Sequence, residues 1–161
     1  MSGGGRKAGG GREADAFELA VRAISRKERT VAELRSWLVA REVEPGEIDE
    51  VVERLASIGG LNDESYATRY AEDKRELRGW GPERIRGALV ERGIERSLAE
   101  AAAGGERPEE QAERAADLLA KRGDSLAADS ERGRALAFLA RRGYDLEVAY
   151  QAVRLAQRRA A

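Results

Sequence analysis

The sequence predicts an all-α protein, built as an elongated, curved array of three tandem three-helix repeats with about nine helices in total. Apolar residues recur at helical spacing along most of the chain, and a short sequence signature recurs at intervals of 51 and 50 residues. Aromatic residues make up only 5% of the 161 residues. Strand-rich folds draw heavily on aromatic and β-branched side chains, so this composition favours helices.

Residues 1–13 are predicted to be a disordered, basic tail, since residues 1–12 hold six glycines and three cations and show no apolar period. Residues 14–59 form the first predicted repeat. Thr30 with Glu33 fits a capping box, and Pro45 interrupts the chain before the third helix. The three apolar stripes are Phe17, Ala20, Val21 and Ile24; Val31, Leu34 and Leu38; and Ile48, Val51, Val52 and Leu55.

Residues 60–105 form the second predicted repeat. Asn62 or Asp63 can cap its first helix, and Pro82 stands at a first-turn position of its second helix. Ser97 with Glu100 predicts another capping box at the start of a short third helix. The stripes of the first two helices are Tyr66, Ala67 and Tyr70; and Ile85, Ala88 and Leu89.

Residues 106–161 form the third predicted repeat, in which Pro108 opens the first helix and Asp145 caps the last. Its apolar positions are Ala112, Ala115, Ala116 and Leu119; Leu136 and Leu139; and Leu146, Ala149, Tyr150 and Val153. Because each repeat buries little surface alone, the repeats must stack, and stacking predicts a long surface without a deep central pocket.

The repeat signature is the end of each middle helix, which reads LVARE from Leu38, LVERGI from Leu89 and LARRGY from Leu139. Gly93 and Gly143 can take the left-handed conformation that ends a helix. The first repeat has Glu42 at the same place. We therefore expect that repeat to end its middle helix differently.

The composition excludes several kinds of chemistry. Cysteine and histidine are both absent, which rules out disulfides, thiolate nucleophiles, Cys/His zinc sites and imidazole bases. We expect no catalytic residue, no metal and no cofactor, so the protein is predicted not to be an enzyme. No apolar stretch is long enough for a membrane span or a signal core, which predicts a soluble protein that is not exported. We expect it to be cytoplasmic, and monomeric because nothing in the sequence indicates an obligate dimer.

The charge balance limits how the chain can contact nucleic acid. Lys and Arg number 29 against 30 Asp and Glu, a formal net charge of −1. A protein that mainly coats duplex DNA carries a clear basic surplus. Any contact with nucleic acid must therefore come from a local patch.

The segment from Gly60 to Ile94 resembles the signature region of RecX proteins, the family that inhibits the bacterial recombinase RecA. The matching elements are Gly60, Leu61, Asp63, Tyr66, Ala67, Tyr70, Lys74, Arg75, Arg78, Gly79, Trp80, Gly81, Pro82, Ile85, Leu89, Gly93 and Ile94. The three-repeat plan extends the resemblance from about residue 14 to residue 156, with weaker sequence specificity in the outer repeats.

This resemblance implies three tandem three-helix repeats that lie along the groove of the RecA filament on single-stranded DNA. It implies that the protein blocks filament growth and suppresses the ATPase and strand-exchange activities of RecA, as a regulator of recombination, DNA repair and the SOS response. A weak direct contact with DNA is also expected. No membrane partner is expected.

The densest cationic group outside the tail is the predicted partner-binding site. Lys74 and Arg78 are four residues apart, so one helix face can present both together with Arg75. Such a face can meet carboxylates or phosphates, although a solvated face balanced by nearby acidic residues is an alternative. The full set is Arg69, Lys74, Arg75, Arg78, Arg84 and Arg86.

Other residues admit both functional and structural interpretations. Trp80, between two glycines, can anchor an interface or fill the joint between neighbouring helices, and Trp37 is expected in the core or at its edge. Asp63, Glu64 and Asp73 could be imagined as an acid/base or metal site, but helix capping explains the first two more simply.

Two alternatives to RecA inhibition remain open. The helices joined at Gly93 resemble a helix-turn-helix in outline, so the chain can be a nucleic-acid-binding helical repeat that acts without RecA. Against this, the helix after the turn carries few side chains that read bases. The other alternative is an adaptor for a helical or acidic partner.

Overall fold

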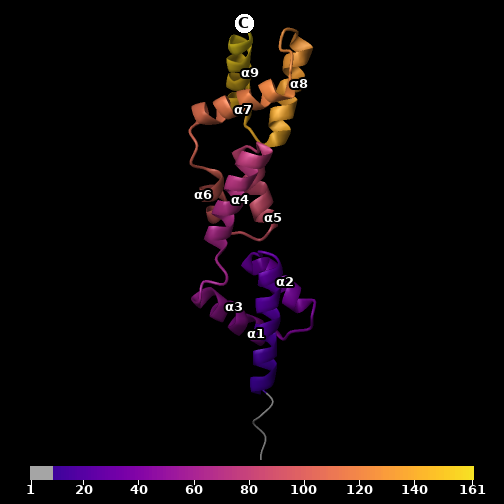
Figure 1. Ribbon diagram of the computed structural model, residues 1–161, viewed down its shortest axis with the longest axis vertical. Coiled ribbons are helices and arrows are strands. Elements are labelled where there is room, and N and C mark those ends of the chain that lie inside the picture. Colours follow the sequence, from indigo (N-terminus) through magenta and orange to yellow (C-terminus); the bar gives the residue numbers. More distant parts are fainter. Residues whose placement is uncertain (1–8) are drawn as a thin grey trace, which may run out of the picture. The chain divides into compact units, whose positions relative to one another are not determined.

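The computed structural model describes residues 9–161, with side chains from residue 15 onward. In this part the chain forms nine α-helices and no strand, which confirms the predicted all-α class (Figure 1). None of the helices described is both long and apolar enough to cross a bilayer. The helices are α1 (Gly9–Arg26), α2 (Val31–Val39), α3 (Pro45–Ser57), α4 (Asp63–Arg78), α5 (Pro82–Glu91), α6 (Arg96–Ala103), α7 (Pro108–Arg122), α8 (Asp129–Arg142) and α9 (Leu146–Ala160).

The first helix begins earlier than the sequence predicts. Residues 9–13, assigned to the tail, lie within α1, and the rest of the predicted tail, residues 1–8, lies outside the described residues. Once a helix has formed, each added residue contributes a backbone hydrogen bond without a new nucleation cost. A packed helix can therefore extend into residues of low helix propensity.

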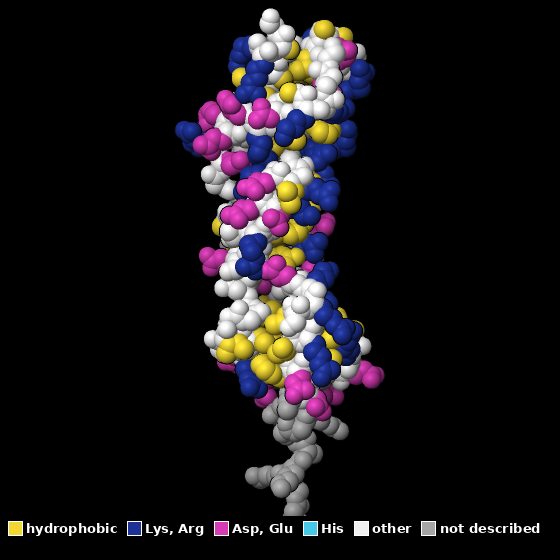
Figure 2. Space-filling model, viewed as in Figure 1, with side chains coloured by type: hydrophobic (Ala, Val, Ile, Leu, Met, Phe, Trp, Pro, Cys, Tyr) yellow, Lys and Arg dark blue, Asp and Glu magenta, His cyan; other side chains and the backbone are white. Residues whose placement is uncertain are grey.

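The chain divides into two compact units. One runs as far as Tyr66 and also contains Arg92–Ile94; the other contains Ala67–Glu91 and Glu95–Ala161. The predicted division into three repeats, at residues 60 and 106, stays a prediction. On the face shown in Figure 2, basic and acidic side chains are interspersed, in keeping with the net charge of −1.

Each unit has its own apolar core. In the first, α1, α2 and α3 pack together around fully buried Leu34, Leu38 and Leu55. In the second, α7 packs along α9, and α8 packs against α9, around Leu119 and Leu139. Each such leucine contributes about 1.5–3 kcal/mol through its burial. The small residues predicted from the stripes allow these helices to approach closely.

The helix starts follow the sequence signals with one exception. All three prolines stand at the first residue of a helix, α3, α5 and α7, where their missing N–H costs nothing. The capping box of Thr30 with Glu33 is confirmed. The one predicted for Ser97 with Glu100 is wrong, because Glu100 pairs with Arg96 at 3.0 Å and Glu95 is the N-cap residue of α6.

The structure also corrects the expectation for Glu42. Glu42 adopts a φ of 60°, in the same left-handed region as Gly93 (83°) and Gly143 (96°). The Val43 N–H donates to the Leu38 carbonyl at 3.2 Å, and the Glu42 N–H donates to the Val39 carbonyl at 3.0 Å. This hydrogen-bond pair is the Schellman motif. The end of α2 thus has the same motif as the end of α8, but with a strained non-glycine residue in the left-handed position.

The left-handed turns at Gly93 and Gly143, which we call glycine corners, each lie directly against the start of an earlier helix. In the first unit, a methyl group added at Gly93 would overlap the Ala32 side chain, and the Thr30 hydroxyl donates to the Arg92 carbonyl at 2.7 Å. Within the second unit, a methyl group at Gly143 would overlap the backbone of Arg84. The same joint therefore occurs once in each unit, with a left-handed glycine seated on the first residues of an earlier helix.

Replacing Glu42 with glycine is expected to stabilise the protein. It removes a left-handed strain of about 1–2 kcal/mol, offset by the greater freedom of glycine in the unfolded chain, about 0.4–1 kcal/mol. The expected net gain is about 0.5–1 kcal/mol in urea unfolding followed by circular dichroism. Glu42→Ala keeps the strain and is the control; an equal gain in that variant would contradict the explanation.

Gly143→Ala is expected to have the opposite effect. The added methyl group combines left-handed strain with overlap on α5, for an expected loss of about 2–4 kcal/mol in the free energy of unfolding. Gly133→Ala is the matched control, because Gly133 lies within α8 and a methyl group there meets no atom within 4 Å. The control should stabilise by up to about 1 kcal/mol.

Candidate partner-binding site

The six predicted cations fall into different environments. Arg75 is turned into the second unit, where its guanidinium donates to the carbonyls of Ala102 and Ala103 at 3.4 Å and its Nε lies 3.5 Å from Glu106. A cation is stabilised there because the C-terminus of α6 is the negative end of the helix dipole. Arg86 pairs with Glu83 at 2.7 Å. Arg69 is exposed on α4.

The other three cations meet residues that the sequence did not single out for binding. Lys74 and Arg78 of α4 and Arg84 of α5 line an open pocket of about 550 Å³, together with residues from the C-terminal half of α8. We call this the cationic pocket. Its residues are Lys74, Arg78, Trp80, Arg84, Phe138, Arg141 and Arg142.

The cationic pocket concentrates positive charge. Its lining contains five cations and no acidic residue, and among the described residues none of these five forms an ion pair with a carboxylate. Elsewhere in the described chain, arginines such as Arg92, Arg107 and Arg132 pair with a nearby Glu or Asp. A nearly neutral chain therefore carries a local, uncompensated positive site, which attracts anions.

Two aromatic rings orient the cations of the pocket. The Arg84 guanidinium carbon lies 4.1 Å from the Trp80 ring centroid, and Lys74 Nζ lies 5.1 Å from it. The Arg142 guanidinium carbon lies 5.1 Å from the Phe138 ring centroid. Each contact contributes about 0.5–1 kcal/mol at an exposed site. The rings therefore limit how far these charges can move.

In the second unit, the turn at Gly143 packs on the start of α5, and we call this contact the corner joint. It brings the cations of α4, α5 and α8 together. The Gly81 N–H donates to the Arg142 carbonyl at 2.7 Å, and the Glu83 N–H donates to the Gly143 carbonyl at 3.0 Å. Arg84 also donates to the Arg141 carbonyl at 3.2 Å. Only glycine permits this approach, since a methyl group at Gly81 would overlap the Gly143 backbone.

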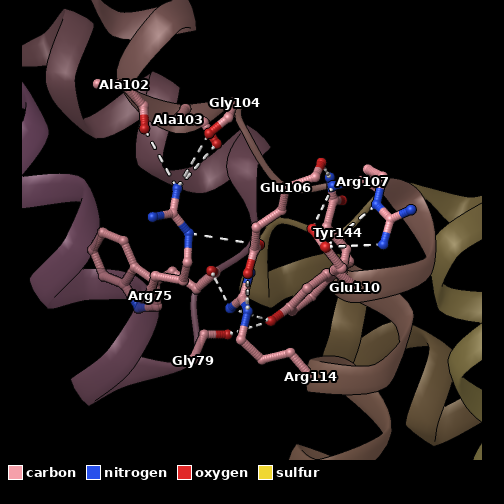
Figure 3. A network of polar contacts seen from close by, with 12 residues as sticks. Arg75, Gly79, Ala102, Ala103, Gly104, Glu106, Arg107, Glu110, Arg114 and Tyr144 are labelled. Atoms are coloured by element: carbon pink, nitrogen blue, oxygen red, sulfur yellow. Dashed lines mark hydrogen bonds and ion pairs between the residues drawn. The ribbon is translucent and has the colours of Figure 1, made fainter.

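A polar network behind the joint holds it in place (Figure 3). Arg114 of α7 donates to the Trp80 carbonyl at 3.0 Å and to the Tyr144 hydroxyl at 2.7 Å, and its Nε donates to Glu106 at 3.0 Å. The Tyr144 hydroxyl donates to the Gly79 carbonyl at 3.0 Å. The network satisfies the turn's carbonyls, which would otherwise be costly to bury.

Asp63 and Asn62 have structural roles as helix caps. Asp63 accepts a hydrogen bond from the Val31 N–H at 2.9 Å, so it caps α2, and Asn62 caps α4 by accepting from the Ser65 N–H at 3.0 Å. Trp80 and Trp37 are both half-buried. Within the described residues, no three acidic side chains form a group that could hold a metal ion.

Helices α5 and α6, which resemble a helix-turn-helix in outline, present few side chains that could read bases. Helices α5 and α6 pack together, but α6 buries Ala99 and Ala103. Arg96, the one cation of α6, pairs with Glu100 of the same helix.

Sequence reasoning missed the half of the pocket that comes from α8. Arg141 and Arg142 stand in the LARRGY signature, which indicated a repeat but not a binding role. Their proximity to Arg84 depends on the corner joint. The sequence did contain a signal for this proximity. The LVERGI and LARRGY segments both contain a corner glycine, Gly93 and Gly143, and each of these glycines packs on the start of an earlier helix.

Two family models match the chain. The family model described as the second three-helix domain of RecX matches residues 62–102, and the model of the first three-helix domain matches residues 16–55. Together these matches cover half of the chain. The chain belongs to the RecX family.

Relatives and solved structures agree with this membership. A regulatory protein RecX of Thermus thermophilus is 34% identical over 89% of this chain and 93% of its own length. One of Deinococcus radiodurans is 40% identical over 84% of this chain, which spans 65% of that relative's length. The crystal structure of RecX from Lactobacillus salivarius has the same fold, with a TM-score of 0.82 at 21% identity over 91% of this chain and 97% of that one.

The RecX fold of this chain buries a tyrosine hydroxyl in the network behind the pocket. Tyr144 is only 3% exposed. Burial raises the pKa of its hydroxyl to about 12, and the adjacent Arg114 guanidinium only partly opposes this rise. The unfolded chain loses the same proton near pH 10.

These values predict a loss of stability in strong alkali. Below about pH 10 the Tyr144 hydroxyl keeps its proton in both the folded and the unfolded state, so it does not make the free energy of unfolding depend on pH. Between about pH 10 and pH 12 the folded state still holds a proton that the unfolded state releases. The free energy of unfolding should therefore fall by up to about 2–3 kcal/mol as the pH rises through this range.

Denaturation at several pH values, compared with Tyr144→Phe, measures this contribution. The variant should be less stable near pH 8, by about 1–3 kcal/mol for the lost hydrogen bonds, and should show a shallower alkaline decline. Tyr150→Phe is the control, because Tyr150 is 50% exposed. Identical alkaline profiles for Tyr144→Phe and the parent protein would contradict the assignment.

Proposed function

We propose that this protein binds the RecA filament on single-stranded DNA and inhibits the ATPase and strand-exchange activities of RecA. It would thereby regulate homologous recombination and DNA repair, without being an enzyme itself. The observation that carries the proposal is the match of both RecX family models, at residues 62–102 and 16–55.

The cationic pocket supports the choice of an anionic partner. A filament on single-stranded DNA offers phosphates and surface carboxylates, and arginine binds both with paired hydrogen bonds. The proposed contact set is the pocket's Lys74, Arg78, Arg84, Arg141 and Arg142. Arg69, Arg75 and Arg86 do not line the pocket, so we leave them out of the contact set.

The side chains of the pocket also support a binding role. Cations and aromatic rings can hold an anion, but the pocket offers no carboxylate base, hydroxyl or thiol to act on it. This is the composition of a recognition surface. It agrees with the regulatory name that the relatives carry.

The first test is the ATPase activity of RecA on single-stranded DNA, titrated with this protein. Inhibition that saturates with added protein is expected. Because the proposal is that the protein inhibits RecA, an unchanged rate of ATP hydrolysis over a wide range of protein concentration would contradict it.

A charge-reversal variant tests the surface. Lys74→Glu, Arg78→Glu and Arg141→Glu combined should raise the half-inhibitory concentration about tenfold or more, equivalent to about 1.4 kcal/mol. The matched control reverses Lys121, Arg154 and Arg158, three exposed cations outside the pocket. Helicity by circular dichroism should be unchanged in both. Equal inhibition by both variants would exclude the pocket as the contact surface.

A further inference from the structure

The cationic pocket combines uncompensated positive charge with stacked planar groups. From this combination we infer that the pocket binds a nucleotide unit of single-stranded nucleic acid, with phosphate held by Arg78, Arg141 and Arg142 and the base stacked on the Arg84–Trp80 pair. The inference deepens the proposed function, since it assigns the pocket to the DNA strand of the filament and not to the recombinase.

The charge argument concerns the phosphate. The side chains of Arg78 and Arg141 form no hydrogen bond or ion pair within the part of the chain that is described, and both line the pocket. Arg142 donates to the Arg78 carbonyl through one nitrogen, which leaves further N–H groups for a ligand. Arginines with unused donors around one open pocket match the oxygens of a phosphate.

The stacking argument concerns the base. With its carbon 4.1 Å from the Trp80 ring centroid, the Arg84 guanidinium covers that ring, and Arg84 is itself exposed. Phe138 forms a second covered ring, with the Arg122 guanidinium carbon 4.2 Å from its centroid. Nucleic-acid bases stack on guanidinium groups as well as on aromatic rings. The two pairs of ring and guanidinium group therefore offer flat surfaces on which a base can stack.

Size and charge distribution favour a single strand over other polyanions. The pocket volume of about 550 Å³ falls in the range of small-ligand sites. A duplex would need a wider basic surface, which a chain of net charge −1 does not readily supply. An acidic peptide would use the cations but would offer no planar base to stack on the Arg84–Trp80 pair. A nucleotide uses both components.

The base contact can be measured through Trp80. The chain has two tryptophans, so Trp37→Phe leaves Trp80 as the sole reporter in the full-length protein, with its fold checked by circular dichroism. Four probes are titrated without RecA: a single-stranded oligothymidylate, an abasic oligomer of equal length, poly-glutamate and free thymidine monophosphate. The oligothymidylate should alter Trp80 fluorescence and bind at least about fivefold more tightly than the abasic oligomer.

The phosphate contact is measured by salt dependence. Arg78→Ala with Arg141→Ala should weaken oligothymidylate binding about five- to tenfold and reduce the slope of log affinity against log salt by roughly 0.7 per lost phosphate contact. Arg154→Ala with Arg158→Ala is the control of equal charge and should change the affinity less than twofold, because neither residue lines the pocket.

Several outcomes would overturn the inference. Equal affinity for the abasic oligomer, with Trp80 fluorescence unchanged, would exclude base stacking. Poly-glutamate that binds as tightly as the oligonucleotide would indicate an acidic-peptide site, and free thymidine monophosphate that binds as tightly would exclude a strand as the specific ligand. RecA inhibition is measured separately, so the proposed function can hold even if the pocket binds no nucleotide.

Discussion

The close contact between a left-handed glycine corner and the start of an earlier helix is the constraint on which the second unit depends. Gly81 and Gly143 allow two backbone hydrogen bonds between segments about sixty residues apart in the sequence, at 2.7 and 3.0 Å. Side chains would separate the two backbones and remove these bonds. The joint also determines where the last residues of α8 lie relative to α4 and α5.

The cationic pocket is a consequence of that joint. Arg141 and Arg142 immediately precede the glycine corner, and Arg84 follows the turn on which the corner rests. The residues that make the contact and the residues that line the pocket are therefore neighbours in the chain. The Arg114, Glu106 and Tyr144 network contacts the same turn and satisfies its carbonyls.

The end of α2 shows how the same left-handed turn behaves with a side chain in place of glycine. Glu42 takes the left-handed conformation at φ 60°, although a glycine would adopt it with less strain. A side chain is tolerated because Glu42 is exposed, whereas Gly93 and Gly143 meet other atoms. Conformation is thus shared by all three corners, and the requirement for glycine arises only at the two that make a contact.

The amino-acid sequence alone was sufficient to predict the helices, their proline starts and most of their buried faces, because apolar periodicity and capping are local properties. The charge balance also indicated that any contact with nucleic acid had to come from a local patch. Only the tertiary structure decided which cations share that patch. Arg75 and Lys74 are adjacent in the sequence, yet one binds the end of α6 and the other faces the pocket, because contacts between distant segments determine which helix face is covered.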